Sequence, residues 1–261
     1  MNRPPRRPTS RPVFKGRGGR PLGTGGERPI LYGWHPVVEA LRNPERKIRK
    51  FLATENALKK LHEEGVPVRV EPEQVRPGDL DRLLTPDAVH QGLYMEADAL
   101  DAPDIFDLPD NGLVLVLDQI TDPHNVGAIV RTAAAFAVDA IVTTNRHSPA
   151  ATGVLAKSAS GGLEHVPVIS VRNLSDSLDE LKERGYLCIG LDSEAAENLD
   201  DIAMRRPLAL VMGAEGKGLR MKTREYCSVL ARMDMPGAIK SLNVSNAAAI
   251  ALYAASRATK G

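Results

Sequence analysis

Hydrophobic residues in the second half of the chain form short unbroken runs, and segments with helical spacing lie between them. The runs predict strands at residues 113–117, 140–144, 166–171, 186–191, 208–212 and 228–231. The intervening spacing predicts helices at residues 125–137, 154–160, 176–184 and 244–258. Because strands without polar alternation are covered on both faces, this order indicates an α/β fold with a parallel sheet between helices.

A smaller α/β pattern occupies the first half of the chain. It predicts strands at residues 30–32, 48–53, 66–70 and 91–95, and helices at 36–42 and 56–64. The acidic segment 98–110, which holds two prolines, fits a linker. We therefore predict a small domain at residues 29–97, a linker at 98–110 and a larger domain at 111–261.

The composition is that of an ordinary globular protein, with 43% hydrophobic and 26% charged residues among 261. Two cysteines are too few for a disulfide framework, and no apolar run is long enough to span a membrane. No apolar core of a secretory signal is present either. These features favour a cytoplasmic protein without a membrane partner.

The charge is unevenly distributed. Residues 1–28 hold eight basic groups and one acid, a net charge of +7, so the remaining residues carry −6 of the overall +1. The segment is rich in Pro and Gly and nearly lacks large apolar side chains, which predicts a disordered basic tail. Such a tail would contact RNA phosphates, or it would be a solubilising extension without a fixed partner.

Three segments follow predicted strands of the larger domain. In open parallel sheets, ligands bind at the edge where the strands end. The segments are 118–131 (Asp-Gln-Ile-Thr-Asp-Pro-His-Asn-Val-Gly-Ala-Ile-Val-Arg), 212–219 (Met-Gly-Ala-Glu-Gly-Lys-Gly-Leu) and 235–246 (Met-Pro-Gly-Ala-Ile-Lys-Ser-Leu-Asn-Val-Ser-Asn). The second lacks the Ser or Thr of a Walker loop and the Rossmann glycine spacing, which argues against a nucleotide or NAD enzyme.

The first segment predicts a helix start and places one charge beyond it. Asp122 fits an N-cap with Pro123 at the first helical position. Arg131 lies among apolar residues, so its burial would require a partner such as a core carboxylate. Asn125 lies six residues before Arg131, which is roughly 240° around a helix, so the two do not share a face.

The third segment precedes the last predicted helix. Ser241 and Asn243 stand where serine and asparagine commonly cap a helix. No metal-ligand spacing links His35 and His90, so we predict no metal site.

Taken together, the three segments closely resemble the motifs of the SpoU/TrmH family. Its members are knotted methyltransferases that use S-adenosylmethionine to methylate ribose 2′-hydroxyls in RNA. The resemblance covers residues 112–261, and a weaker one over residues 30–93 is to the ribosomal-protein-like substrate-binding domain of many such enzymes. It implies a deep trefoil knot and a homodimer. The small-residue face of the last helix (Ala247, Ala248, Ala251 and Ala255) suits close packing between copies.

The resemblance assigns roles to residues of the three segments. It implies that Arg131 is catalytic and that Glu215 is its counter-charge. The full predicted catalytic set is Arg131, Asn125, Glu215, Ser241 and Asn243, and the predicted cofactor-binding set is Gly213, Met233, Leu242, Met212 and Leu191. One departure from the family is Asp234, which stands in an Ile-Pro-Met-like segment and would lie in the adenine pocket or at its rim.

Residues 159–168 also resemble the family, in which this stretch shapes the side of the target base. Glu164 and His165 would form an acid/base pair, or His165 would be an ordinary loop histidine with a satisfied partner. We predict an S-adenosylmethionine-dependent RNA ribose 2′-O-methyltransferase with no DNA partner. The target would be a guanosine of 23S rRNA, because the N-terminal domain is similar to that of the 23S rRNA guanosine enzymes. The alternatives are a tRNA target or a catalytically silent RNA-binding protein on the same fold.

Overall fold

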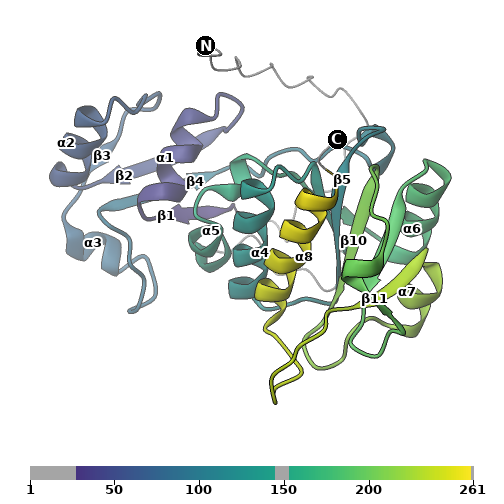
Figure 1. Cartoon of the computed structure of the whole chain (residues 1–261). Coiled ribbons are helices and arrows are strands. Elements are labelled where there is room, and N and C mark those ends of the chain that lie inside the picture. The colour runs from purple at the N-terminus through teal and green to yellow at the C-terminus, as the bar shows by residue number, and fades with distance from the viewer. Residues whose placement is uncertain (1–27, 145–152, 260–261) are drawn as a thin grey trace, which may run out of the picture.

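The computed structural model describes residues 28–144 and 153–259, which form a four-stranded and a seven-stranded sheet, each with its own helices (Figure 1). The predicted basic tail lies outside the described residues, apart from Arg28. Among the described residues, no helix is both long enough and apolar enough to cross a membrane.

The larger sheet confirms the predicted parallel α/β architecture. Its strand order is β7-β6-β5-β10-β8-β11-β9, and every neighbouring pair is parallel. The strands are β5 (Leu113–Asp118), β6 (Ala140–Thr144), β7 (Val168–Val171), β8 (Leu187–Leu191), β9 (Glu197–Asn198), β10 (Leu208–Gly213) and β11 (Val229–Arg232). Because Gly213 pairs with Asp118 in register, the central strands β10 and β5 end level with each other.

Helices cover both faces of this sheet (Figure 1). The helices are α4 (Pro123–Ala135), α5 (Gly153–Ala159) and α8 (Val244–Ala258) on one face, and α6 (Leu174–Glu183) and α7 (Met221–Tyr226) on the other. In β5, Leu115 packs in the core beneath α4 and α8, whereas Val116 packs in the core beneath α6. The strands are therefore continuously apolar because each side chain meets a helix layer.

Capping residues set the starts of two helices of the larger sheet. The Asp122 side chain accepts a hydrogen bond from the His124 amide at 3.1 Å and Pro123 is the first residue of α4, as predicted. The Asn243 side chain caps α8 in the same way, through the Ser245 amide at 2.9 Å.

The small-residue face of α8 is buried within the chain. Ala248, Ala251 and Ala255 are fully buried in the core that α8 shares with α4. The suggestion that this face packs against a second copy is therefore wrong.

The smaller sheet has the order β1-β4-β2-β3, with only β2 and β3 parallel. Its elements are β1 (Ile30–Tyr32), α1 (Trp34–Arg42), β2 (Ile48–Ala53), α2 (Glu55–Glu63), β3 (Glu73–Gln74), α3 (Pro77–Asp81) and β4 (Leu93–Ala97). Helix α1 begins two residues before the predicted Pro36, because the Gln91 side chain accepts a hydrogen bond from the free Trp34 amide at 2.9 Å. Pro36 is tolerated there because a first-turn amide has no partner within the helix.

The strand predicted at residues 66–70 is wrong. Pro67 offers no amide for a strand ladder, and Val68 is 42% exposed. Arg69 instead donates to the Leu41 carbonyl at the end of α1, at 3.0 Å, and the third strand forms later in the chain, at β3. The apparent alternation was therefore a segment that caps a helix.

The segment predicted as a linker packs on the larger sheet. It contains the 3-10 helix η1 (Ile105–Asp107), and Ile105 and Leu108 are buried beside α6. Arg184 donates to the Ile105 carbonyl at 2.7 Å, which fixes the segment in place. Two further 3-10 helices, η2 (Gly162–Glu164) and η3 (Leu199–Asp201), lie after α5 and β9. The deep trefoil knot stays a prediction.

Candidate active site

The three segments singled out in the sequence meet at one edge of the larger sheet. Strands β5, β10, β8 and β11 are consecutive neighbours, and because all are parallel their carboxyl ends lie side by side. The first segment leaves β5, the second leaves β10, and the third follows β11 and leads into α8. The geometry therefore assembles one polar edge from segments that lie up to 128 residues apart in the chain, from Asp118 to Asn246.

Apolar side chains from three of these strand ends form the floor of the edge. Leu191 at the end of β8 and Met212 at the end of β10 are buried in one cluster, and Met233 after β11 packs against it. Leu242, before α8, is 37% exposed and stands outside that cluster. The chemistry of this floor suits a flat apolar group such as an adenine ring.

The loop after β10 folds back on itself, and Gly213 makes this possible. The Gly218 amide donates to the Ala214 carbonyl at 2.8 Å, which closes the loop. A Cβ placed on Gly213 would lie 2.2 Å from the Gly218 carbonyl carbon, so any side chain would force the loop open. The resemblance assigned Gly213 to cofactor binding, and the structure shows that its missing side chain also gives room to its own loop.

A hydrogen bond joins the first and third segments. The Asn243 side-chain amide donates to the Asn125 side-chain carbonyl at 2.9 Å, while its own carbonyl caps α8. Both side chains are half-buried. This pair locks the start of α4 to the start of α8, so both asparagines hold the backbone of the edge in place.

Three of the predicted catalytic side chains are open to solvent. Arg131, Glu215 and Ser241 are exposed, and among residues 28–144 and 153–259 none of the three side chains makes a hydrogen bond or an ion pair. The alternative of a buried Arg131 paired with a core carboxylate is therefore wrong. The predicted contact between Glu215 and Arg131 is also absent from the described part of the chain.

A buried carboxylate that the sequence analysis missed supports the same edge. Asp118, the last residue of β5, is fully buried, and Arg220 after the second segment binds it twice. The Arg220 amide donates at 3.1 Å and its Nε at 2.7 Å. Gln119 then adopts a left-handed conformation with φ of 59°, which turns the chain out of the sheet. An acid at the end of an unbroken apolar strand was the available signal, because a buried charge requires a partner.

Asp234, the departure from the family pattern, lies at the rim of the edge. Its carboxylate accepts hydrogen bonds from Arg232 Nε at 2.8 Å and from the Asn198 side-chain amide at 2.5 Å. Asp234 is exposed and ties β11 to β9. It is not part of the apolar floor.

Glu164 and His165 do not form an acid/base pair with each other. Glu164 binds Arg46, and His165 Nε2 lies 2.8 Å from Glu39, so both face the smaller sheet. The alternative of a loop histidine with a satisfied partner is confirmed. His90 has a similar role, because its Nδ1 accepts from the Gly92 amide at 3.0 Å and its Nε2 contacts Asp81.

Neither cysteine is available as a nucleophile at neutral pH. Burial raises the pKa of Cys188 and of Cys227 to about 12 from 9.0, so both thiols stay protonated. Within the described ranges, no group of three His, Cys, Asp or Glu side chains could hold a metal ion.

Comparisons with known proteins place both halves of the chain. Residues 112–253 match the SpoU rRNA Methylase family, and residues 30–103 match the family described as RNA 2'-O ribose methyltransferase substrate binding. The chain is 38% identical over 243 residues to the 23S rRNA (guanosine-2'-O-)-methyltransferase RlmB of Ralstonia nicotianae, covering 87% of this chain and 95% of that one. It is 35% identical over 240 residues to RlmB of Bordetella pertussis, covering 89% and 98%.

Solved structures share the fold. The SpoU methyltransferase AviRb from Streptomyces viridochromogenes superposes with a TM-score of 0.75 at 23% identity, covering 90% of each chain. AviRb in complex with the cofactor AdoMet superposes with a TM-score of 0.73 at 23% identity, covering 87% of this chain and 89% of that one.

Proposed function

This chain belongs to the SpoU rRNA methylase family, and we propose that it transfers a methyl group from S-adenosylmethionine to the ribose 2′-hydroxyl of a guanosine in 23S rRNA. The single observation that supports this most strongly is the meeting of three family segments at one strand edge, where an apolar floor lies beside exposed polar side chains. The same proposal places the protein in the cytoplasm, with ribosomal RNA.

The floor and its loops fit the cofactor. Leu191, Met212 and Met233 would supply apolar contacts for an adenine ring, and the exposed Leu242 before α8 would add another. The half-exposed backbone at Gly213 offers amide and carbonyl groups for the polar part of the molecule. When bound, S-adenosylmethionine would supply a methyl group on a positively charged sulfur to the ribose oxygen.

Arg131 stabilises the charge that develops on the ribose oxygen. A guanidinium remains protonated in proteins, so it acts as a donor and a positive charge and does not abstract the proton. Its exposure and lack of a partner in the described part of the chain leave its donors available for the target phosphate and the 2′-oxygen. A donor aimed at a developing oxyanion typically contributes about 10²–10³ in rate.

The other polar groups hold this arrangement. Asn125 and Asn243 fix the starts of α4 and α8, and the exposed Ser241 lies two residues before the Asn243 cap. Glu215 on the closed loop after β10 accepts hydrogen bonds from the RNA or orients Arg131 once the substrate is bound. The proton of the ribose hydroxyl leaves to a water or to a substrate phosphate at this open edge.

A mapping experiment tests the function in cells. 2′-O-Methylation is mapped across total RNA from a strain that lacks this gene, from its parent, and from the deletion strain complemented with wild type or with Arg131→Ala. One 23S rRNA guanosine should lose its methyl group and regain it only with wild type. Loss of a methyl group in tRNA alone would move the target to tRNA, and no loss anywhere would leave a silent RNA-binding protein.

We also infer a homodimer that uses the outer face of α8. Tyr253 is 58% and Ile250 48% exposed on that face, and the Tyr253 ring packs edge-on against Phe136, the C-cap of α4, with ring centroids 6.5 Å apart. Large exposed apolar side chains on one helix mark an interaction surface, and this one lies beside the third segment. Sedimentation analysis should show a dimer that Tyr253→Glu dissociates. Met221→Glu in α7, which changes a side chain that is 77% exposed, should leave the dimer intact.

A further inference from the structure

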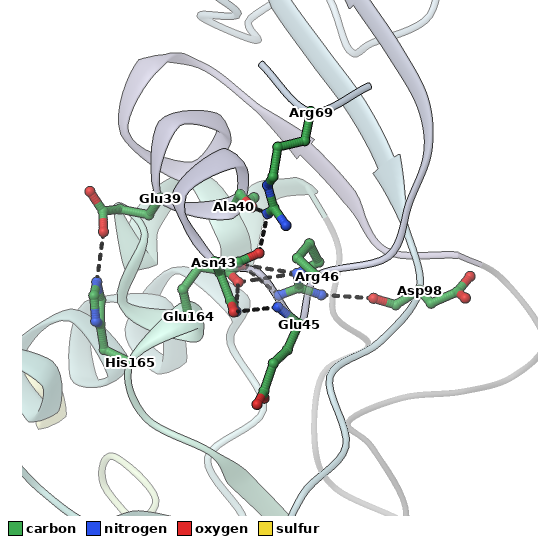
Figure 2. A network of polar contacts seen from close by, with 9 residues as sticks. All are labelled: Glu39, Ala40, Asn43, Glu45, Arg46, Arg69, Asp98, Glu164 and His165. Carbon is green, nitrogen blue, oxygen red and sulfur yellow. Dashed lines mark hydrogen bonds and ion pairs between the residues drawn. The ribbon is translucent and has the colours of Figure 1, made fainter. Parts of the chain in front are cut away.

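A buried ion pair joins the smaller sheet to the larger one. Arg46, between α1 and β2, binds Glu164 of η2 with Nη2 to Oε1 at 2.5 Å and Nε to Oε1 at 3.1 Å (Figure 2). The two side chains are only 4% and 3% exposed. The partners lie 118 residues apart in sequence, one in each of the two halves of the molecule.

Every polar atom of this pair is engaged, as Figure 2 shows. The Asn43 side chain donates to Glu164 Oε2 at 2.7 Å, and Arg46 Nη1 donates to the Asp98 carbonyl at 2.8 Å. A desolvated ion pair is costly unless its geometry and surrounding hydrogen bonds are complete. Such a pair is therefore specific to one relative placement of its two elements, because a small displacement leaves both charges buried and unpaired.

Close backbone approach around the ion pair enforces the same placement. A Cβ on Gly161, whose φ is +90°, would lie 2.5 Å from Glu39 Cγ of α1, so only glycine lets the two elements meet there. His165 contacts the Glu39 carboxylate, and the Lys157 ammonium of α5 donates to the Gln91 side chain at 3.1 Å. Residues from both domains therefore contribute contacts that fix their relative placement.

The 3-10 helix η2, which carries Glu164, packs against the backbone of α4 at the candidate catalytic arginine. A Cβ on Gly162 would lie 3.2 Å from Arg131 Cα and 3.0 Å from the Val130 carbonyl, so the backbone of η2 touches the backbone of α4 at Arg131. Glu164 is two residues further along the same 3-10 helix. A displacement of η2 would therefore move the backbone support of Arg131 as well as the smaller domain.

We propose that Arg46 and Glu164 are positioning residues for the methyl-transfer reaction. They fix the substrate-binding domain and the catalytic edge as one rigid surface, so that RNA bound to the smaller domain presents its ribose to Arg131. This inference rests on the proposed function. It assigns Arg46, the first basic residue of the Arg46–Lys50 run, to the domain interface.

Kinetics with 23S rRNA test this role through Arg46→Ala and Glu164→Gln. The matched control is Arg49→Ala, which removes an arginine from the same region. Arg49 is itself 48% exposed, and its partner Asp98 belongs to the same half of the molecule rather than to the other side of the interface. We expect kcat/KM for RNA to fall about tenfold in both interface variants, with cofactor affinity unchanged, because a small misplacement of substrate is costly in rate. Arg49→Ala should stay within about threefold of wild type by the same criterion.

Hydrogen exchange separates this inference from the proposed function. The His165 and Val166 amides both donate to the Gly162 carbonyl at 3.0 Å, and their exchange should accelerate in both variants without RNA or cofactor. Wild-type kinetics in folded Arg46→Ala and Glu164→Gln, compared well below their unfolding temperatures, would overturn the positioning role. If Arg46→Ala fails to fold, the isosteric Glu164→Gln alone decides. Absence of transfer by wild type would instead refute the function, while the exchange rates would still report on the docked domain.

Discussion

Two sets of charged side chains, one at the domain interface and one at the carboxyl edge of the larger sheet, differ in how far the fold buries and pairs them. At the domain interface, Arg46 and Glu164 are almost completely buried and each polar atom has a partner. At the carboxyl edge of the larger sheet, Arg131 and Glu215 are exposed and have no side-chain partner among the described residues. We call the first set closed, because protein groups bind its polar atoms, and the second set open, because its polar atoms face solvent and can bind a ligand.

This difference distinguishes side chains that hold the fold together from side chains that can act on a substrate. A side chain whose hydrogen-bond donors all bind other protein groups holds two elements together. It has no free donor for a substrate. An arginine whose backbone is held in a helix but whose guanidinium has no protein partner keeps all its donors for substrate. The comparison therefore predicts that mutations on the closed side change stability or domain placement, and that mutations on the open side change catalysis.

The largest effect should come from Arg131→Ala. Because its side chain is exposed and unpartnered in the described structure, the unfolding temperature should stay within about one degree of wild type, as for most surface changes. The rate of methyl transfer should fall about 10²–10³-fold. Arg131→Lys should also be slow, since an ammonium cannot replace a planar fork. Turnover by either variant close to wild type would remove Arg131 from the chemistry.

Arg220→Ala gives the matched change on a closed arginine at the same edge. It removes the charged partner of the buried Asp118 carboxylate and leaves it only the backbone amide of residue 220. Breaking a fully buried pair costs about 3–5 kcal/mol, but the Arg220 side chain is 43% exposed, so we expect roughly 1–3 kcal/mol of stability. Chemical denaturation measures this loss. Equal stability of Arg220→Ala and Arg131→Ala would break the distinction between closed and open arginines.

Gly213→Ala tests the loop that borders the open edge. The added methyl group would overlap the Gly218 backbone and open the loop, so cofactor affinity should fall at least about tenfold, or roughly 1.4 kcal/mol. Calorimetry measures the affinity. Gly78→Ala in α3 is the control, because a Cβ there meets no atom within 4 Å. Unchanged affinity in a folded Gly213→Ala would place the cofactor elsewhere.

The sequence predicted most of this fold because the strands can be recognised from short stretches of the chain. Continuous apolar runs and caps such as Asp122 depend on neighbours in the chain, and those strands and the start of α4 are confirmed. The Arg46–Glu164 pair could not be predicted, since nothing near Arg46 distinguishes it from the exposed basic residues that follow. The strand at residues 66–70 was wrong because the role of Arg69 depends on the distant end of α1.

The open edge was predicted by resemblance and the closed contacts were not. Motif residues such as Arg131 and Asn243 could be recognised because a family requires them at a fixed order along the chain. Their partners could not, since Asp118 meets Arg220 across 102 residues and only the finished sheet brings them together. Short elements such as α7 and β9 also escaped prediction, because six and two residues carry too little periodicity.

The two cysteine thiols should make the stability of the folded protein depend on pH. Burial raises the folded-state pKa of Cys188 and Cys227 from 9.0 to about 12. A raised pKa favours the folded state below the unfolded value, and that contribution is lost as pH rises through the folded value. The unfolding temperature should therefore decline between about pH 9 and 12, and less so in Cys188→Ala/Cys227→Ala. An unchanged alkaline slope in that double variant would assign the decline to other groups.

The smallest effect should come from deleting residues 1–28, most of which lie outside the described residues. Removing a net charge of +7 should make the dependence of log RNA affinity on log salt shallower, by counterion release. Cofactor affinity and unfolding temperature should not change, because no motif lies there. The same salt slope with and without these residues would mean that the rest of the chain alone binds RNA.

Methyl transfer from labelled S-adenosylmethionine to purified 23S rRNA tests the central claim most directly. The product is digested to nucleosides and identified by mass spectrometry, with wild type, Arg131→Ala and Arg220→Ala assayed side by side. We expect 2′-O-methylguanosine from wild type, substantial product from folded Arg220→Ala, and almost none from Arg131→Ala, whose stability should match that of wild type. A methyl group on a base, or full activity of Arg131→Ala, would contradict it.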